Sequence, residues 1–399
     1  MLTTDPVIIN LEPQVLNRIQ VLHIITDFDD GGAQAVLYRF IKADRKNDHQ
    51  VISLVSIGWY GDRLIESGVK VYSLGMPNGK LTVGGLTKLY RLIREINPQV
   101  IQTWMYHSDL VGSIIARLAG KKILIWGIHN TDLDPTKTAI LTRLTVRACA
   151  MLSKNIPQQI ISCSQEGVKV HAAIGYQSKK IVVVANGYDI SEFSPNPVTR
   201  SELRHTWQIA ENTTLLGMVA RWNPQKDHQN LIEGLAHLQT QLRLPWHCVL
   251  VGSELTTDNH VFVALLEQYG LTDRVSLLGV RTDISAVMNA LDLHILSSAY
   301  GEAFPNVVSE AMACGTPCVV TRVGDAALIV GDTGWAVPSK DPIQLATAIS
   351  EAVQARSHQI LWAERQAACR QRIQDNFSLQ IMIDKYHDVW KDSIALETN

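Results

Sequence analysis

Two glutamates stand close together in the segment YGEAFPNVVSEAMACGTP (300–317), which is otherwise small and apolar. Glu302 and Glu310 have seven residues between them, and Pro305 follows the first glutamate closely. Proline suits the first turn of a helix and a Gly-Thr-Pro sequence ends one, so the pattern predicts a helix of about ten residues. Glu302 then precedes the helix, Glu310 projects from its second turn, and unpaired backbone amides lie between them. Such a site can bind a diphosphate through the amides and sugar hydroxyls through the carboxylates. A solvated helix face is the alternative for Glu310, but its neighbours are apolar.

Two cations lie in ARWNPQKDHQNLIEGLA (220–236), in the loop that follows a predicted strand. Ligands of open parallel sheets bind at the carboxyl ends of the strands, where such loops lie. Arg221 ends the strand, and Lys226 precedes Asp227, a residue type that caps helix N-termini. Two cations beside a helix N-terminus can bind a diphosphate through charge-assisted hydrogen bonds. Ordinary surface charge is the alternative interpretation of this loop.

A pair of glycines occupies the loop after the first predicted strand, TDFDDGGAQ (26–34). Gly31 and Gly32 immediately precede a predicted helix, where a backbone without Cβ atoms can approach a phosphate closely. A tight turn is the alternative. The full G-x-G-x-x-G fingerprint is absent from this loop, which disfavours a nicotinamide-dependent dehydrogenase.

Five segments of the chain, in order and at the expected spacing, resemble the retaining glycosyltransferases of family 4. The segment with the two glutamates resembles the E-x7-E signature of that family, and residues 220–235 resemble its phosphate-binding segment. The other three are GGAQAVLYRF (31–40), VVVANGYDISEFSP (182–195) and VGDAALIVGDTGWAVPSKDP (323–342). The resemblance covers most of the chain. It implies the GT-B fold, an α/β architecture of two Rossmann-like parallel-sheet domains facing a deep inter-domain cleft, with a C-terminal helix crossing back to the first domain.

The resemblance also implies roles for individual residues. Arg221 and Lys226 would bind the donor diphosphate, Glu310 the ribose and Glu302 the sugar that is transferred. His129, in WGIHNTD (126–132), falls where the family has a histidine facing the reacting sugar, although a lone histidine is more often structural. Further donor contacts are implied for Gly31, Gly32, Ala303, Phe304, Asn306 and Val307, with the backbone of Val280 and Arg281 framing the base. No metal or other cofactor is expected, because the two cations and the helix amides can stabilise the leaving diphosphate.

Four departures from the family pattern are visible. The phosphate-binding segment begins MVAR (218–221) where the family has G-R. Asp227 stands where the family has a glycine, and Asp325 replaces the usual residue before a hydrophobic pair. The segment VGSELTTDN (251–259) lacks the G-x-G that the family has after this strand.

The predicted activity is retaining transfer of a hexose or N-acetylhexosamine from a nucleotide-diphosphate sugar, with UDP favoured over GDP. The acceptor would be a glycan or a lipid-linked glycan in cell-surface polysaccharide biosynthesis. The alternatives are a nucleotide-sugar epimerase or phosphorylase on the same fold, a non-catalytic nucleotide-sugar-binding protein, and a metal-dependent transferase of the other common fold. The last would use an acidic pair such as Asp27-Phe28-Asp29 or Asp132-Leu133-Asp134.

The elements that must position these residues follow from the hydrophobic pattern. Short β-branched runs alternate with amphipathic stretches in both halves of the chain, which predicts two α/β units with parallel sheets. The predicted strands are 19–25, 51–57, 100–104, 123–128 and 160–164, then 215–220, 248–252, 275–279, 293–297 and 318–321. We expect an acceptor-binding domain over residues 1–190, a nucleotide-sugar-binding domain over 191–376 and a returning helix over 377–399.

Two further helices are predicted from spacing. Residues 377–390 carry apolar residues at helical spacing, and the resemblance implies that this helix packs on the first domain. Residues 137–154 place Arg143, Arg147 and Lys154 on one face, beside an apolar stripe of Ile140, Leu141, Leu144, Ala148 and Met151. This helix either packs on its own sheet or rests on anionic lipid, as basic amphipathic helices do.

Composition and charge limit the class of protein. The 399 residues carry a net charge of −2, yet residues 1–195 hold 21 Lys and Arg against 16 Asp and Glu. The first half therefore suits an anionic partner, but no nucleic-acid-binding motif accompanies its dispersed cations. No apolar run is long enough for a membrane span, and the N-terminus does not resemble a signal peptide. Six scattered cysteines favour a reducing compartment, with Cys314 and Cys318 as a redox or metal pair the alternative. We expect a cytoplasmic protein with peripheral contact to the inner face of the plasma membrane.

Overall fold

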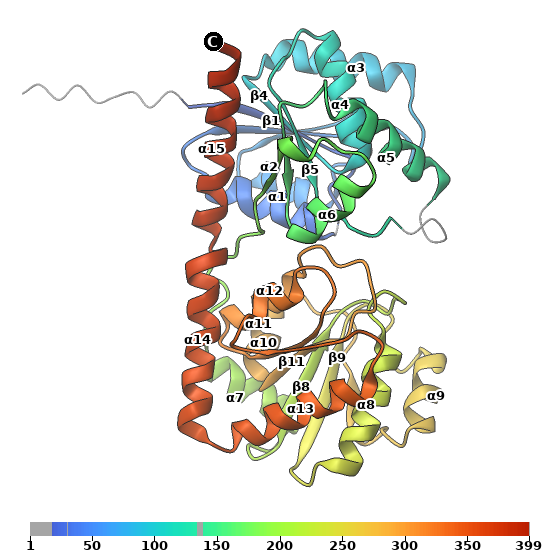
Figure 1. Ribbon diagram of the computed structural model, residues 1–399, viewed down its shortest axis with the longest axis vertical. Helices are drawn as coiled ribbons and strands as arrows, with labels where there is room; N and C mark the ends of the chain where they lie inside the picture. The colour runs from blue at the N-terminus through green and yellow to red at the C-terminus, as the bar shows by residue number, and fades with distance from the viewer. Residues whose placement is uncertain (1–17, 30, 134–138, 399) are drawn as a thin grey trace, which may run out of the picture.

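The computed structural model describes residues 18–29, 31–133 and 139–398. They form two domains, each built on a parallel β-sheet, which follow one another along the long axis of the molecule (Figure 1). The first sheet has the strand order β3-β2-β1-β4-β5-β6-β7. Its strands are β1 Gln20–Ile25, β2 Asp48–Ser53, β3 Lys70–Ser73, β4 Val100–Trp104, β5 Leu124–Ile128, β6 Gln159–Ser162 and β7 Ile181–Val183. All its neighbouring strands pair in parallel, as the sequence pattern predicts.

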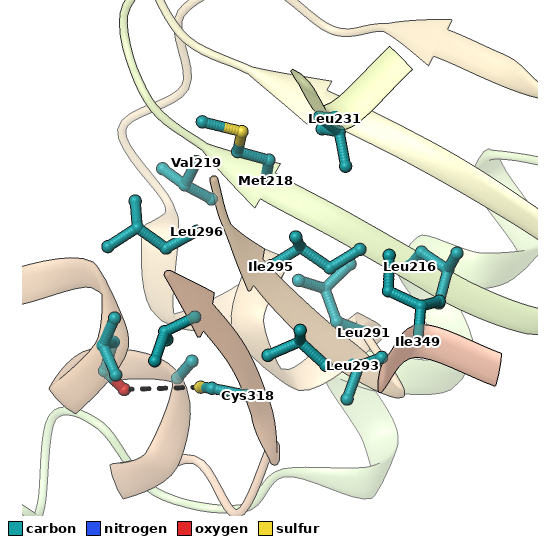
Figure 2. Packing of buried hydrophobic residues seen from close by; sticks show 14 of the residues in the cluster. Leu216, Met218, Val219, Leu231, Leu291, Leu293, Ile295, Leu296, Cys318 and Ile349 are labelled. Atoms are coloured by element: carbon teal, nitrogen blue, oxygen red, sulfur yellow. Dashed lines mark hydrogen bonds between the residues drawn. The ribbon is translucent and has the colours of Figure 1, made fainter. Parts of the chain in front are cut away.

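The second sheet is also parallel, with the order β10-β9-β8-β11-β12-β13. Its strands are β8 Thr214–Val219, β9 Trp246–Val251, β10 Val275–Leu277, β11 Leu293–Leu296, β12 Cys318–Thr321 and β13 Trp335–Val337. Central strands of this sheet are buried on both faces. Figure 2 shows residues of β8 and β11, such as Leu216 and Ile295, together with Leu231 and Ile349 from covering helices.

Helices connect the strands of both sheets. Those of the first domain are α1 Gly32–Ala43, α2 Gly58–Glu66, α3 Val83–Ile96, α4 Tyr106–Leu118, α5 Ile140–Leu152 and α6 Gln165–Ala173. Those of the second are α7 Pro197–Thr206, α8 His228–Gln241, α9 His260–Gln268, α10 Ile284–Ala290, α11 Asn306–Ala313, α12 Ala326–Val330 and α13 Pro342–Arg356. No helix in the described part of the chain is both long and apolar enough to cross a bilayer.

Two long helices close the chain and run along one side of both domains (Figure 1). Helix α14 (Gln359–Phe377) packs on the second domain, and α15 (Leu379–Thr398) returns to the first. Met382, Tyr386 and Trp390 of α15 are buried in the core of the first domain, where Tyr386 lies against Phe40 with ring centroids 4.8 Å apart. The prediction that the terminal helix packs on the first domain is confirmed.

Each predicted strand overlaps an observed one, but three strands were missed: β3, β7 and β13. All three lie at an edge of their sheet. Their side chains are mostly half-exposed. β3 (KVYS) begins and ends with a polar residue and β13 (WAV) is only three residues long, so neither has the long apolar run of a strand covered on both faces. The six cysteines are buried as free thiols, and burial raises the pKa of Cys314 to about 12. A thiol in this state is a poor nucleophile and a poor metal ligand.

Candidate active site

Glu302 pairs with a predicted donor-site cation. Its Oε1 lies 2.5 Å from Nζ of Lys226 and accepts a hydrogen bond of 2.6 Å from the Ser298 hydroxyl. The residue is only 7% exposed. The hydroxyl of Ser297 donates to the carbonyl oxygen of Lys226 at 2.9 Å, which holds the two loops together. The structure therefore brings together the acid and the cation that the sequence placed in separate loops.

Helix α11 begins one residue later than the sequence pattern predicts. Pro305 is its N-cap residue rather than part of the first turn, and the helix has eight residues. The amides of Asn306 and Val307 belong to the first turn and have no acceptor within the helix. Phe304 is buried, with its ring centroid 5.3 Å from that of Phe377, and Ala303 beside it is also buried. The start of α11 is thus fixed by packing while its first amides remain suited to an anion.

The loop between β8 and α8 contains the other predicted cation. Arg221 is exposed at the end of β8. Asp227 caps α8, and its side chain accepts a hydrogen bond of 3.3 Å from the amide of Asn230. Asp227 also has a φ of 49°, in the left-handed region that favours glycine and tolerates aspartate. Asp227 thus adopts a conformation that glycine also favours, and its side chain adds a helix cap.

The two glycines of the first domain lie against the start of α11. Gly31 is the N-cap residue of α1, and a Cβ atom added there would clash with the side chain of Gln34. A Cβ on Gly32 would lie 3.6 Å from Nδ2 of Asn306, in the second domain. The glycine pair and the side chain of Asn306, the first residue of α11, therefore meet at the junction of the two domains.

His129 follows β5 and stacks on Trp104, with ring centroids 4.8 Å apart and planes 13° apart. Burial lowers the pKa of His129 to about 4, so the imidazole is neutral at neutral pH. Both ring nitrogens are buried without a hydrogen-bond partner among the described residues. Two residues further on, the hydroxyl of Thr131 donates to the backbone oxygen of Glu302 at 2.8 Å. The histidine loop is therefore adjacent to the loop that carries Glu302.

A buried hydrogen-bond chain, unforeseen in the sequence, lies behind Trp104. The indole Nε1 donates to Nδ1 of His23 at 3.1 Å, and Nε2 of His23 lies 3.0 Å from Nδ1 of His49. Because an indole only donates, His23 must carry its proton on Nε2 and donate to His49. Nε2 of His49 and Nε2 of His387, from α15, then donate to Asp44 at 3.1 and 2.7 Å. Burial would raise the pKa of Asp44, but these hydrogen bonds lower it well below its usual range.

Glu310 pairs with a residue that the sequence did not single out. Its Oε1 lies 3.3 Å from Nη1 of Arg39, on α1 of the first domain, and each side chain is 12% exposed. Burial raises the pKa of Glu310, and the guanidinium of Arg39 opposes this rise. The guanidinium also lies over the ring of Tyr188, 4.9 Å from its centroid. In the sequence, only its position two turns after the glycine pair, on the predicted helix, could have pointed to Arg39.

Val280 and Arg281 are the two residues predicted to frame the base. Val280 is 72% exposed, and the side chain of Arg281 pairs with Asp283. Among the described residues, no hydrogen bond or ion pair links Val280 or Arg281 to the two glutamates.

Of the two acidic pairs that a metal-dependent transferase could use, only Asp27 and Asp29 both lie within the described residues. Asp27 accepts a hydrogen bond from Gln34 at 2.9 Å, and Asp29 accepts one from Ser56 at 3.1 Å. Asp134 lies outside the described residues. Within residues 18–29, 31–133 and 139–398, no group of three His, Cys, Asp or Glu side chains is arranged to hold a metal ion.

Two Rossmann-like domains, whose strand-end loops bring Lys226 to Glu302 and Gly32 to Asn306, have the architecture of a GT-B glycosyltransferase. Two family models match the chain: residues 30–192 match Glycosyltransferase Family 4, and residues 199–374 match Glycosyl transferases group 1. The chain belongs to this group of glycosyltransferases.

Two relatives are named as transferases of sugars to lipid-linked substrates. The chain is 23% identical over 314 residues to an Escherichia coli UDP-Gal:alpha-D-GlcNAc-diphosphoundecaprenol alpha-1,3-galactosyltransferase, covering 78% of this chain and 79% of that protein. It is 26% identical over 303 residues to a Campylobacter jejuni N,N'-diacetylbacillosaminyl-diphospho-undecaprenol alpha-1,3-N-acetylgalactosaminyltransferase, covering 72% and 78%.

Solved structures share the fold. Anabaena HepE in complex with UDP superposes with a TM-score of 0.82 at 23% identity, over 94% of this chain and all (100%) of that one. WaaG, a glycosyltransferase involved in lipopolysaccharide biosynthesis, has a TM-score of 0.69 at 19% identity, over 92% and 99%.

Proposed function

We propose that this protein is a retaining glycosyltransferase that moves a hexose or N-acetylhexosamine from a UDP-sugar to a lipid-linked glycan. The observation that carries this proposal is the contact of Lys226 and Ser298 with Glu302, directly before the first amides of α11. A cation and free amides suit the diphosphate of a nucleotide sugar, and a carboxylate beside them suits the hydroxyls of the sugar.

The positive charges of the predicted site suit a reaction in which a diphosphate is the leaving group. Breaking the bond between the transferred sugar and the diphosphate leaves negative charge on the leaving group, which Lys226, Arg221 and the α11 amides would stabilise without a metal. The acceptor hydroxyl would attack from the face that the diphosphate leaves, and the departing phosphate would take its proton. His129, neutral and buried on Trp104, is suited to donate or accept a hydrogen bond at the sugar rather than to supply charge.

A lipid-linked acceptor is favoured by the two relatives, whose names specify diphosphoundecaprenol-linked substrates. Helix α5 offers a matching surface. Four apolar side chains are exposed on it: Ile140 at 68%, Leu141 at 51%, Leu144 at 54% and Met151 at 75%. Its buried side consists of Thr145, Val146, Cys149 and Ala150. With Arg147 and Lys154 exposed beside it, the apolar stripe suits the boundary of an anionic bilayer at the inner face of the membrane.

The proposal is tested by measuring UDP released from UDP-galactose, UDP-glucose and their N-acetyl derivatives, with and without an undecaprenyl-diphosphate-linked sugar. We expect release to depend on the acceptor and to be unaffected by EDTA, and the anomeric signal of the product to match that of the donor. Release without acceptor would favour hydrolysis, and loss of activity with EDTA would favour the metal-dependent alternative. An inverted anomer would contradict the retaining mode. UDP binding with no product from any donor would favour a non-catalytic binding protein.

A further inference from the structure

Arg39 and Glu310 form a largely buried ion pair that joins a helix of the first domain to a helix of the second. Arg39 lies on α1, which follows the glycine loop, and Glu310 lies on α11, which follows Glu302. The pair is 3.3 Å long, and 12% of each side chain is exposed. The Coulomb attraction within a pair shielded in this way is stronger than in a surface ion pair, because water and salt screen it less.

The guanidinium of Arg39 stacks on a residue of the linker, residues 184–196, which joins β7 of the first domain to α7 of the second. Its carbon lies 4.9 Å from the centroid of the Tyr188 ring, and the Tyr188 hydroxyl donates to Oδ1 of Asn306 at 2.6 Å. Asn186 donates to the same oxygen at 3.0 Å. Arg39 is therefore fixed by stacking on an aromatic ring that is itself tied to the start of α11.

Both partners retain unused hydrogen-bonding atoms. Nε and Nη2 of Arg39 are buried without an acceptor among the described residues. Arg39 contacts only Oε1 of Glu310, and no hydrogen bond to Oε2 is found in the described part of the chain. Buried donors without acceptors are rare in folded proteins, and a bound ligand or an ordered water is what usually satisfies them. A ribose with two vicinal hydroxyls supplies both donors and acceptors.

We propose that Arg39 is a positioning residue for the donor: it orients Glu310 so that Oε2 accepts from the ribose hydroxyls, and its own free N–H groups donate to the ribose oxygens. This inference rests on the proposed function, which places the ribose at Glu310. Because the pair joins α1 to α11, ribose recognition is coupled to the contact between the two domains. A nucleotide without the ribose hydroxyls should therefore bind with an affinity that no longer depends on Arg39.

The charges around Glu310 allow a second test, the pH dependence of nucleotide binding. Burial raises the pKa of Glu310, Arg39 lowers it, and the nearby carboxylate of Glu192 raises it. Tyr188 faces the pair from the linker, and its pKa is raised, chiefly by burial. If Arg39 loses its charge, the pKa of Glu310 must rise further, and nucleotide binding should weaken at a higher pH than in the wild type.

The experiment is calorimetric titration of the full-length protein with UDP and with 2′,3′-dideoxy-UDP, with GDP as a parallel probe. We expect Arg39→Met to weaken UDP binding by about tenfold to 100-fold, as for loss of a hydrogen bond to a charged group, and to change dideoxy-UDP binding by less than about twofold. Arg39→Lys should restore part of the UDP affinity. In Arg39→Met the acid limb of UDP binding should move to higher pH.

The matched control is Arg63→Met, which removes an arginine that also lies over an aromatic ring, 3.6 Å from the centroid of Trp59, on α2. It should leave both affinities unchanged. Equal losses of UDP and dideoxy-UDP affinity in Arg39→Met would show a merely structural role and overturn the inference, as would unchanged UDP affinity. If Arg39→Met does not fold, Arg39→Gln and Arg39→Lys decide the same comparison.

The failure of the proposed function would look different. A wild-type protein that binds neither UDP nor GDP would contradict both proposals. A wild type that binds UDP and loses affinity in Glu310→Gln, but not in Arg39→Met, would contradict only the role of Arg39.

Discussion

The indole of Trp104 lies nearly parallel to the imidazole of His129 and donates its N–H, from the edge of the ring, to Nδ1 of His23. Trp104→Phe keeps an aromatic ring under His129 but leaves Nδ1 of His23 without a donor. We expect a loss of about 1–3 kcal/mol in the free energy of unfolding, the usual effect of an unsatisfied buried acceptor. Turnover should fall by about tenfold through misplacement of His129, with UDP affinity unchanged. Urea denaturation and steady-state kinetics check this, with the exposed Trp59→Phe as control.

Removal of either donor-site cation should reduce transfer strongly. Arg221→Ala and Lys226→Ala are each expected to lower kcat by about 10²- to 10³-fold, as for loss of one charge-stabilising group. Only Lys226→Ala also leaves the buried carboxylate of Glu302 without its cation. Thermal unfolding should therefore shift in Lys226→Ala and not in Arg221→Ala. Wild-type turnover in both variants would contradict the assignment of these cations to the diphosphate.

The two glutamates should separate nucleotide binding from turnover. Glu310→Ala should weaken binding of free UDP, because this residue is assigned to the ribose. Glu302→Ala should leave UDP binding nearly intact and reduce turnover, because it is assigned to the transferred sugar. UDP titration together with initial rates distinguishes the two. The reverse pattern would exchange the two roles.

Membrane contact through α5 predicts binding to vesicles that contain anionic lipid. Co-sedimentation should weaken as salt is raised, because screening reduces the attraction of Arg147 and its neighbours to the surface. It should also fall in Met151→Ser and in the double variant Arg143→Ser with Arg147→Ser. Arg243→Ser with Lys340→Ser removes the same charge from exposed positions of the second domain and should have no effect. No binding at low salt would favour a soluble acceptor.

Buried histidines should make the protein less stable in acid. Burial, reinforced by the charge of Lys226, lowers the pKa of His294 to about 3, from 6.5 in an unfolded chain. Between these values the unfolded state binds a proton that the folded state does not, so stability falls as pH falls. The contribution is about 1.4 kcal/mol per pH unit. His294→Leu should flatten the pH dependence of unfolding between pH 6 and about 4 by this amount, whereas the exposed His237→Gln should not.

Much of the fold and part of the site were predictable because both rest on local pattern. Parallel strands align their carboxyl ends, so loops such as those of Lys226 and Glu302 were expected to meet at one edge. The pair of Arg39 with Glu310 was not predictable, because it joins residues 271 positions apart across a domain junction. No periodicity indicates which cation on a helix face reaches the other domain.

Helix α5 illustrates a second limit of sequence reasoning. Its apolar stripe was visible, but hydrophobic spacing alone does not show which side of a helix meets the sheet. The structure buries small and β-branched residues such as Val146 and Ala150, and leaves the larger Leu144 and Met151 exposed.

The return of α15 to the first domain determines when that domain can finish folding. Trp390 and Tyr386 lie in its core beside residues of β1 and α1, so the core contains side chains from both ends of the chain. Synthesis proceeds from the N-terminus, and domains generally fold as they emerge. The first domain must therefore wait, with part of its core open, until the whole second domain has been made. A chain cut short before Trp390 would lack core side chains of the domain that was synthesised first.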